Sequence, residues 1–130
     1  MYKIEKKDYG VHLTFGGFID SPEMEKWVEE SKRFLETFPP KFGVFVDMRE
    51  LKPLPEGSQA VMQIGQKLYK QKGMQRSVVI LDNAITTLQF KRIAKDTGID
   101  EWERYIDASA TENWQEAGEK WIVDATDPDE

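Results

Sequence analysis

The sequence contains no cysteine and a single histidine, His12, among its 130 residues. The absence of cysteine excludes disulfides, thiol nucleophiles and thiolate metal sites. One histidine without cysteine cannot form the usual zinc sites or nucleophile–histidine pairs. We therefore interpret His12, which lies between Val11 and Leu13 in an alternating stretch, as a solvent-facing strand residue and not as a catalytic base.

The sequence also lacks an excess of positive charge and any long apolar run. Its 18 basic residues are outnumbered by 24 acidic ones, for a net charge of −6, which argues against a nucleic-acid partner. No apolar stretch reaches the roughly 18 residues that a membrane-spanning helix needs. The N-terminal residues alternate apolar and charged side chains and contain no hydrophobic signal segment. We expect a cytoplasmic protein with no integral membrane segment.

The residues that are present indicate one folded domain. A hydrophobic fraction of 39%, with 12% aromatic residues, is enough for a single core in a chain of this length. There is no internal repeat and no interdomain linker. We expect one domain over residues 1–125, followed by a frayed acidic tail over residues 126–130.

Hydrophobic periodicity predicts the order of helices and strands. Alternating residues predict an N-terminal hairpin of strands over 2–7 and 11–15. Further strands are predicted at 42–48, 77–81 and 104–107, and helices at 21–38, 56–72, 84–97 and from 111 onward. Residues 42–48 are apolar almost throughout, as is typical of a strand that is covered on both faces. The fold class is therefore α/β: a hairpin followed by βα repeats, a mostly parallel five-stranded sheet and four helices, with strands 42–48 and 77–81 adjacent and parallel.

The second and third predicted helices carry more apolar residues than one buried stripe requires. We assign the inward face of the second helix to Ala60, Val61, Ile64 and Leu68. The third helix has apolar residues on two sides. We interpret the surplus as a partner surface, formed by Met62, Tyr69, Ile85, Leu88, Phe90 and Ile93. The alternative is that residues 84–87 belong to a loop and the third helix has a single apolar face.

Two aspartates mark a candidate ligand edge. Asp47 and Asp82 end neighbouring parallel strands, and Trp102 lies in a loop before the last strand. Such a carboxylate pair could hold Mg²⁺ or serve phosphoryl chemistry, as in a receiver domain. A receiver domain would also need an acidic pair where only Asp20 stands, and a lysine after the last strand, which here ends at Asp107. We therefore favour loop and helix capping for these residues and expect no metal or cofactor.

Three segments carry a resemblance to a known family. Gly17–Asp20, which precedes a helix, resembles a Gly-x-hydrophobic-Asp motif at the end of a second strand. Residues 44–51 resemble a strand whose aspartate leads into the helix with a regulatory serine, and residues 92–99 resemble a third helix that ends in glycine and an aliphatic residue. In this order and spacing they resemble the STAS domains, the family of anti-sigma factor antagonists and their SpoIIAA-like relatives. The resemblance implies the SpoIIAA-like fold and a regulatory role.

The chain departs from that family at the phosphoacceptor motif. The family motif is Asp-Ser followed by Ser/Thr-Gly, whereas the corresponding residues here are Pro55, Glu56, Gly57 and Ser58. The phosphoacceptor position falls on Gly57, so the chain resembles a divergent member. Ser58 stays a candidate phosphorylation site, because the first turn of a helix favours negative charge. The alternative is that Ser58 is a capping residue.

These observations favour a non-enzymatic regulatory or protein-interaction domain. We expect it to dock a protein partner or a second copy of itself, as a homodimer, through the second and third helices. The alternative is a small-molecule module that holds a lipid or nucleotide in an apolar cleft between helices and sheet. A third hypothesis is an enzyme that uses Asp47 and Asp82.

Overall fold

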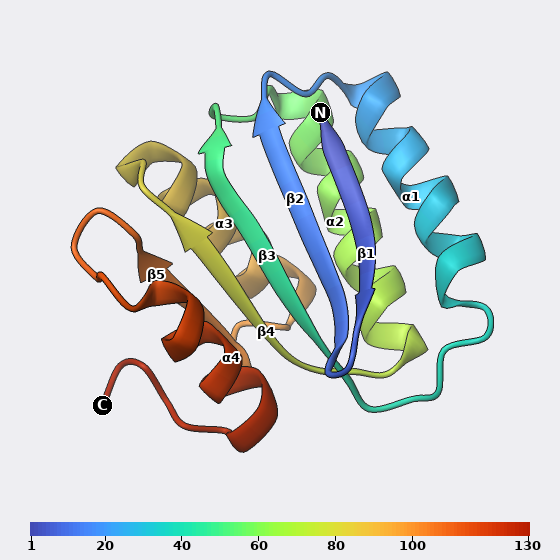
Figure 1. The fold of residues 1–130 in the computed structure, drawn as a ribbon. Coiled ribbons are helices and arrows are strands. Elements are labelled where there is room, and N and C mark those ends of the chain that lie inside the picture. The colour runs from blue at the N-terminus through green and yellow to red at the C-terminus, as the bar shows by residue number, and fades with distance from the viewer.

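The computed structural model describes all 130 residues and contains five strands and four helices. The elements follow one another along the chain as β1 (Tyr2–Lys7), β2 (Gly10–Gly17), α1 (Ser21–Leu35), β3 (Phe42–Leu51), α2 (Glu56–Lys72), β4 (Met74–Leu81), α3 (Ala84–Thr97), β5 (Glu103–Asp107) and α4 (Trp114–Asp124) (Figure 1). The predicted α/β class, hairpin and element order are confirmed. None of the four helices is both long and apolar enough to cross a lipid bilayer.

The five strands form one sheet in the order β1-β2-β3-β4-β5. β1 is antiparallel to β2, and all other neighbouring strands are parallel. Val44 pairs with Ser77 and Val46 with Val79, which confirms that strands 42–48 and 77–81 are adjacent and parallel. Parallel crossovers are right-handed and here run in one direction across the sheet. They therefore place α1, α2 and α3 on one face, and α4 covers the opposite face (Figure 1).

The two faces of the sheet bury cores of unequal size. The inner face, which lies under α1, α2 and α3, contributes to a cluster of 24 buried residues. The outer face, which lies under α4, contributes to a cluster of six, among them Phe45, Trp121 and Ile122. Because side chains alternate along a strand, Val44 and Val46 belong to the inner cluster while Phe45 between them belongs to the outer one.

Helix α1 forms where its capping residues predict it. The carboxylate of Asp20 accepts a hydrogen bond from the backbone N–H of Glu23 at 3.0 Å, and Pro22 occupies the first turn. The buried stripe of α1 includes Met24, Trp27 and Leu35. The helix ends at Leu35 and not at residue 38, one full turn before the Pro39-Pro40 pair.

Helix α2 has the predicted bounds, but its buried face is not the predicted one. Ile64 is 58% exposed and Ala60 is also exposed, whereas Met62 and Tyr69 are buried in the inner core. The assignment of Met62 and Tyr69 to a partner surface is therefore wrong. In the predicted stripe, only Val61 is buried.

The reason for this orientation is a close contact between α2 and α1 at Gly65. A Cβ atom at Gly65 would lie 2.0 Å from Cζ3 of Trp27, so only glycine allows the indole to approach the helix this closely. The indole of Trp27 also stacks on Tyr69, with ring centroids 5.6 Å apart. The contact turns the Gly65 side of α2 inward. Sequence periodicity missed it because glycine carries no hydrophobic signal.

The C-terminal residues are held in place. The guanidinium of Arg104 donates from Nε and Nη2 to the two carboxylate oxygens of Asp127, each at 3.0 Å. The same guanidinium lies 4.2 Å from the ring centroid of Trp121. Asp127 is therefore anchored, and the expectation of a frayed tail does not hold at this residue.

We expect Gly65→Ala to lower the free energy of unfolding by about 1–3 kcal/mol, because the added methyl group forces Trp27 out of its packing. The matched control is Gly57→Ala in the same helix. Its Cβ would make an ordinary contact of 3.6 Å with Ser21, so it should leave stability unchanged or raise it by up to about 1 kcal/mol. Urea denaturation measures both variants. Equal effects of the two substitutions would contradict the packing argument.

Candidate functional site

Ser58 is not available for phosphorylation in the folded chain. Its side chain is 0% exposed, and its Oγ donates a hydrogen bond to the carbonyl of Ile19 at 2.7 Å. The hydroxyl therefore fastens the start of α2 to the segment between β2 and α1. The candidate phosphorylation site at Ser58 is wrong for this fold, because a kinase cannot reach a fully buried hydroxyl. Gly57, the position that corresponds to the family's phosphoacceptor, is exposed but has no hydroxyl.

Of the predicted partner surface, only Ile85 and Leu88 remain on the outside. They are 62% and 69% exposed. Phe90 and Ile93 are buried in the inner core, so they cannot contact a partner. The alternative that residues 84–87 form a loop is also wrong. The helix begins at Ala84, and the side-chain oxygen of Asn83 accepts hydrogen bonds from the first free N–H groups.

Asp47 and Asp82 do not form a joint site. The Asp47 carboxylate accepts hydrogen bonds from Nε of Arg49 at 3.0 Å, from its Nη2 at 2.9 Å and from its backbone N–H. Partial burial acts to raise the pKa of Asp47, but the bonds from Arg49 outweigh it and hold that pKa below its ordinary value. Asp82 is exposed and forms no ion pair. Nowhere in the chain do three or more metal-ligating side chains converge.

Trp102 is a packing residue between the two cores. Its half-buried ring contacts both the inner and the outer cluster. Its Nε1 is buried without a hydrogen-bond partner. Trp102 does not lie with Asp47 and Asp82 at one ligand edge, because it precedes β5, whereas Asp47 lies within β3, which continues to Leu51, and Asp82 follows β4.

The structure reveals a buried acid that sequence reasoning missed. Glu103 is only 5% exposed, at the first position of β5. One carboxylate oxygen accepts a hydrogen bond from Oγ of Ser77 at 3.0 Å, and the other accepts from the hydroxyl of Tyr105 at 2.6 Å. Burial raises the pKa of Glu103 to about 7, although these two hydrogen bonds act in the opposite direction. The last strand is predicted to begin at residue 104, whereas it begins at Glu103. A predicted start at residue 103 would have shown, from the alternation of side chains, that Glu103 and Tyr105 lie on the same face of the strand.

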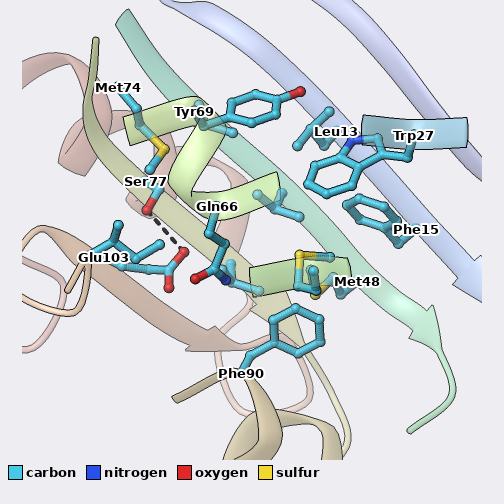
Figure 2. A pocket seen from close by; sticks show the side chains of 15 residues that line it. Leu13, Phe15, Trp27, Met48, Gln66, Tyr69, Met74, Ser77, Phe90 and Glu103 are labelled. Carbon is cyan, nitrogen blue, oxygen red and sulfur yellow. Dashed lines mark hydrogen bonds between the residues drawn. The ribbon is translucent and has the colours of Figure 1, made fainter. Parts of the chain in front are cut away.

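Glu103 borders a small interior cavity between the sheet and the helical layer (Figure 2). The cavity has a volume of about 30 Å³, and 12 of its 15 lining residues are hydrophobic, Met48, Met62 and Met74 among them. Its polar lining is Glu103, Ser77 and Gln66. This volume accommodates one or two water molecules and is far below the roughly 300 Å³ at which small-molecule sites begin. The cavity therefore holds no lipid or nucleotide in this conformation.

A larger hollow lies on the surface, at the carboxyl ends of β4 and β5. We call it the α3–β5 groove; its volume is about 500 Å³. Apolar atoms come from Leu81, Ala84, Leu88, Tyr105 and Ile106, and charges come from Asp82, Lys91 and Asp107. Ligands of open α/β sheets bind outside this edge of the strands.

The position of α3 beside the groove is set by Gln89. Its side-chain oxygen accepts a hydrogen bond from the N–H of Leu54 at 2.8 Å, and its Nε2 donates to the Leu54 carbonyl at 3.1 Å. This pair of bonds ties α3 to the loop between β3 and α2. With Gln89 and Phe90 directed to the protein, Ile85 and Leu88 face solvent, and Leu88 also lines the groove.

The groove combines apolar and charged side chains. Five of its ten lining residues are hydrophobic, and the carboxylate of Asp107 accepts a hydrogen bond from the hydroxyl of Ser109 at 2.6 Å. Lys91 lies over the ring of Tyr105, with its Nζ 5.6 Å from the ring centroid. The Ser109 hydroxyl and the Asp107 carboxylate are both exposed, and Asp107 also accepts from the backbone N–H of Ser109, so the pair closes the turn that follows β5.

No protein-family model matches this chain, and no curated protein matches it. The resemblance to STAS domains therefore depends on the three sequence segments alone.

We expect the stability of the wild-type chain to fall as pH rises from about 4.5 to about 7, relative to Glu103→Gln. Because burial raises the pKa of Glu103 from its ordinary value of 4.5 to about 7, the unfolded chain releases this proton at lower pH than the folded chain. The stabilisation is complete below the unfolded pKa and is lost as pH rises through the folded pKa. Its full size is about 3 kcal/mol.

Urea denaturation over the range from about pH 4.5 to pH 8 measures this difference. The control is Glu101→Gln, two residues earlier and exposed, whose curve should run parallel to that of the wild type. Parallel curves for Glu103→Gln and wild type would show that Glu103 titrates as an ordinary surface carboxyl.

Proposed function

We propose that this chain is a non-enzymatic interaction domain that docks a protein partner, or a second copy of itself, through the outer side of α3 and the α3–β5 groove. The observation that carries this proposal is the exposure of Ile85 and Leu88, one turn apart, on a helix that is already anchored by Phe90 and Ile93. A helix needs one apolar stripe to pack on its own sheet. A second apolar pair left in water is a feature of protein interfaces.

The groove beside this pair has the composition of an interface. Leu88, Tyr105 and Ile106 are among its hydrophobic lining residues. Charged groups, among them Asp82 and Lys91, also line it. Apolar centres with polar rims are common in protein–protein contacts, and tyrosine is enriched in them.

The proposed docking surface does not extend over α2. Met62 and Tyr69 are buried, and Ile64 is the one large hydrophobic residue of α2 that is exposed. Polar side chains join the two helices between them: Arg92 donates to Gln59, and Gln63 donates to Asp96. Polar pairs along this seam interrupt any continuous apolar patch.

A regulatory role in the cytoplasm is what the resemblance to anti-sigma factor antagonists implies. In this proposal the regulation does not act through Ser58, because that hydroxyl is buried. The alternative of a lipid or nucleotide module has weaker support, since the apolar interior cavity is about 30 Å³. An enzyme that uses Asp47 and Asp82 has no support from the geometry, because the Asp47 carboxylate is bonded to Arg49 and Asp82 is exposed without a hydrogen bond or ion pair.

We expect a photo-cross-linking amino acid at position 88 to form one discrete adduct in cells that express the chain, and the same group at position 123 to form none. Val123 is the matched control, since it is 58% exposed on α4, which covers the opposite face of the sheet. We expect Leu88→Glu to weaken the captured complex by about 10-fold or more, because a carboxylate would be desolvated in an apolar contact. Val123→Glu should not change it.

Sedimentation equilibrium of the purified chain then separates the two kinds of partner. A dimer that Leu88→Glu dissociates identifies a second copy, whereas a monomer with a heterologous adduct identifies another protein. Adducts of equal yield at positions 88 and 123, or none at position 88, would refute docking at α3.

A further inference from the structure

The hydroxyl of Tyr105 lies between two acceptors on different elements. It is 2.6 Å from a carboxylate oxygen of Glu103 on β5 and 3.2 Å from the backbone carbonyl of Phe90 on α3. A tyrosine hydroxyl has one proton, so it donates a well-aligned hydrogen bond to only one of them at a time. The other oxygen of Glu103 accepts from Ser77, and no cation pairs with the carboxylate.

We propose that Glu103 and Tyr105 form a proton-controlled latch that decides whether β5 is hydrogen-bonded to α3, and that the latch thereby regulates docking at the α3–β5 groove. The regulatory part rests on the function proposed above, while the latch itself does not. When Glu103 is ionised, its carboxylate is the stronger acceptor and holds the Tyr105 proton. When Glu103 takes up one proton from solvent, its carboxyl O–H donates to Tyr105, whose own O–H then turns to the Phe90 carbonyl.

The latch adjoins the proposed docking surface directly. Tyr105 and Leu88 both line the groove, and Leu88 lies on the helix that carries Phe90. Lys91, one residue after Phe90, lies over the Tyr105 ring. A hydrogen bond gained or lost between Tyr105 and Phe90 therefore acts on the spacing between α3 and β5 at the groove itself.

The groups around the Glu103 carboxyl are mostly neutral, and few charges lie near it. From α2, the neutral side chain of Gln66 lines the same cavity and accepts a hydrogen bond from the hydroxyl of Thr97 on α3 at 2.8 Å. From β4 it faces the hydroxyl of Ser77. The charged groups nearby are Asp100, which acts to raise the pKa of Glu103, and the two lysines that lie over neighbouring aromatic rings, Lys91 at Tyr105 and Lys70 at Trp102.

The latch is tested by NMR titration of the full chain with ¹³C labels on glutamate and tyrosine. We expect the Glu103 carboxyl carbon and the Tyr105 ring carbon that bears the hydroxyl to titrate together, with a midpoint near 7. Glu103→Gln should abolish the Tyr105 transition. Tyr105→Phe should keep the Glu103 titration and move its midpoint upward, because the ionised form loses a hydrogen bond.

Ser77→Ala is the matched control. It removes the other hydrogen bond to Glu103 and leaves the contact between Tyr105 and Phe90 in place. We expect it to shift the midpoint as well but to leave the Tyr105 transition coupled to it. If the Tyr105 ring carbon does not titrate together with the Glu103 carboxyl carbon in the wild-type chain, the latch is refuted by that measurement alone.

The regulatory part is tested by the yield of the adduct at position 88 as a function of pH. We expect the wild-type yield to change several-fold across the Glu103 midpoint, and the yield of Glu103→Gln to stay constant. If the two NMR signals titrate together but the yield of the adduct at position 88 does not change with pH, the proposed regulation is refuted and the latch is retained. The absence of any adduct at position 88 at every pH would instead refute docking, and the NMR titration would still decide the latch.

Discussion

The contact between Trp27 and Gly65 governs the helical layer of this protein. The indole is buried against a helix that has no side chain at that point, stacks on Tyr69 and meets Phe15 of β2 edge-on, with centroids 5.2 Å apart. One ring thus joins α1, α2 and the sheet. Because protein interiors are close-packed, this contact leaves little rotational freedom for α2 and decides which of its residues enter the core. The burial of Met62 and the exposure of Ile64 follow from it.

Three helices cover one face of the sheet and one helix covers the other, so the edges of the sheet are not covered equally. β5 is the last strand of the sheet, and α3 is the last helix of the inner layer, so neither has a neighbour on its far side. The α3–β5 groove and the exposed pair Ile85–Leu88 lie at this open flank. Apolar residues that no internal element covers remain in water unless a partner covers them, and their exposure carries an energetic cost that the proposed docking would remove.

Glu103 connects this surface to the interior. A buried carboxylate without a cation is costly, and here two hydroxyls, of Ser77 and Tyr105, supply the only hydrogen bonds. The strand alternation that places Glu103 and Tyr105 on one face also puts the tyrosine hydroxyl within reach of α3. The same short β5 therefore contributes a titratable group to the core and an aromatic ring to the groove.

The sequence by itself determined those features that depend on near neighbours along the chain. Caps and hydrophobic periodicity located α2 and α3 to the residue, and the apolar strand at 42–48 implied the parallel pairing with β4, because these signals act within a few residues. The tertiary structure alone decided which side of α2 is buried, why Ser58 is inaccessible and where Glu103 lies. Each of these depends on a residue far away in the chain, namely Trp27, Ile19 and Ser77, and a contact of that kind leaves no periodic trace in the sequence.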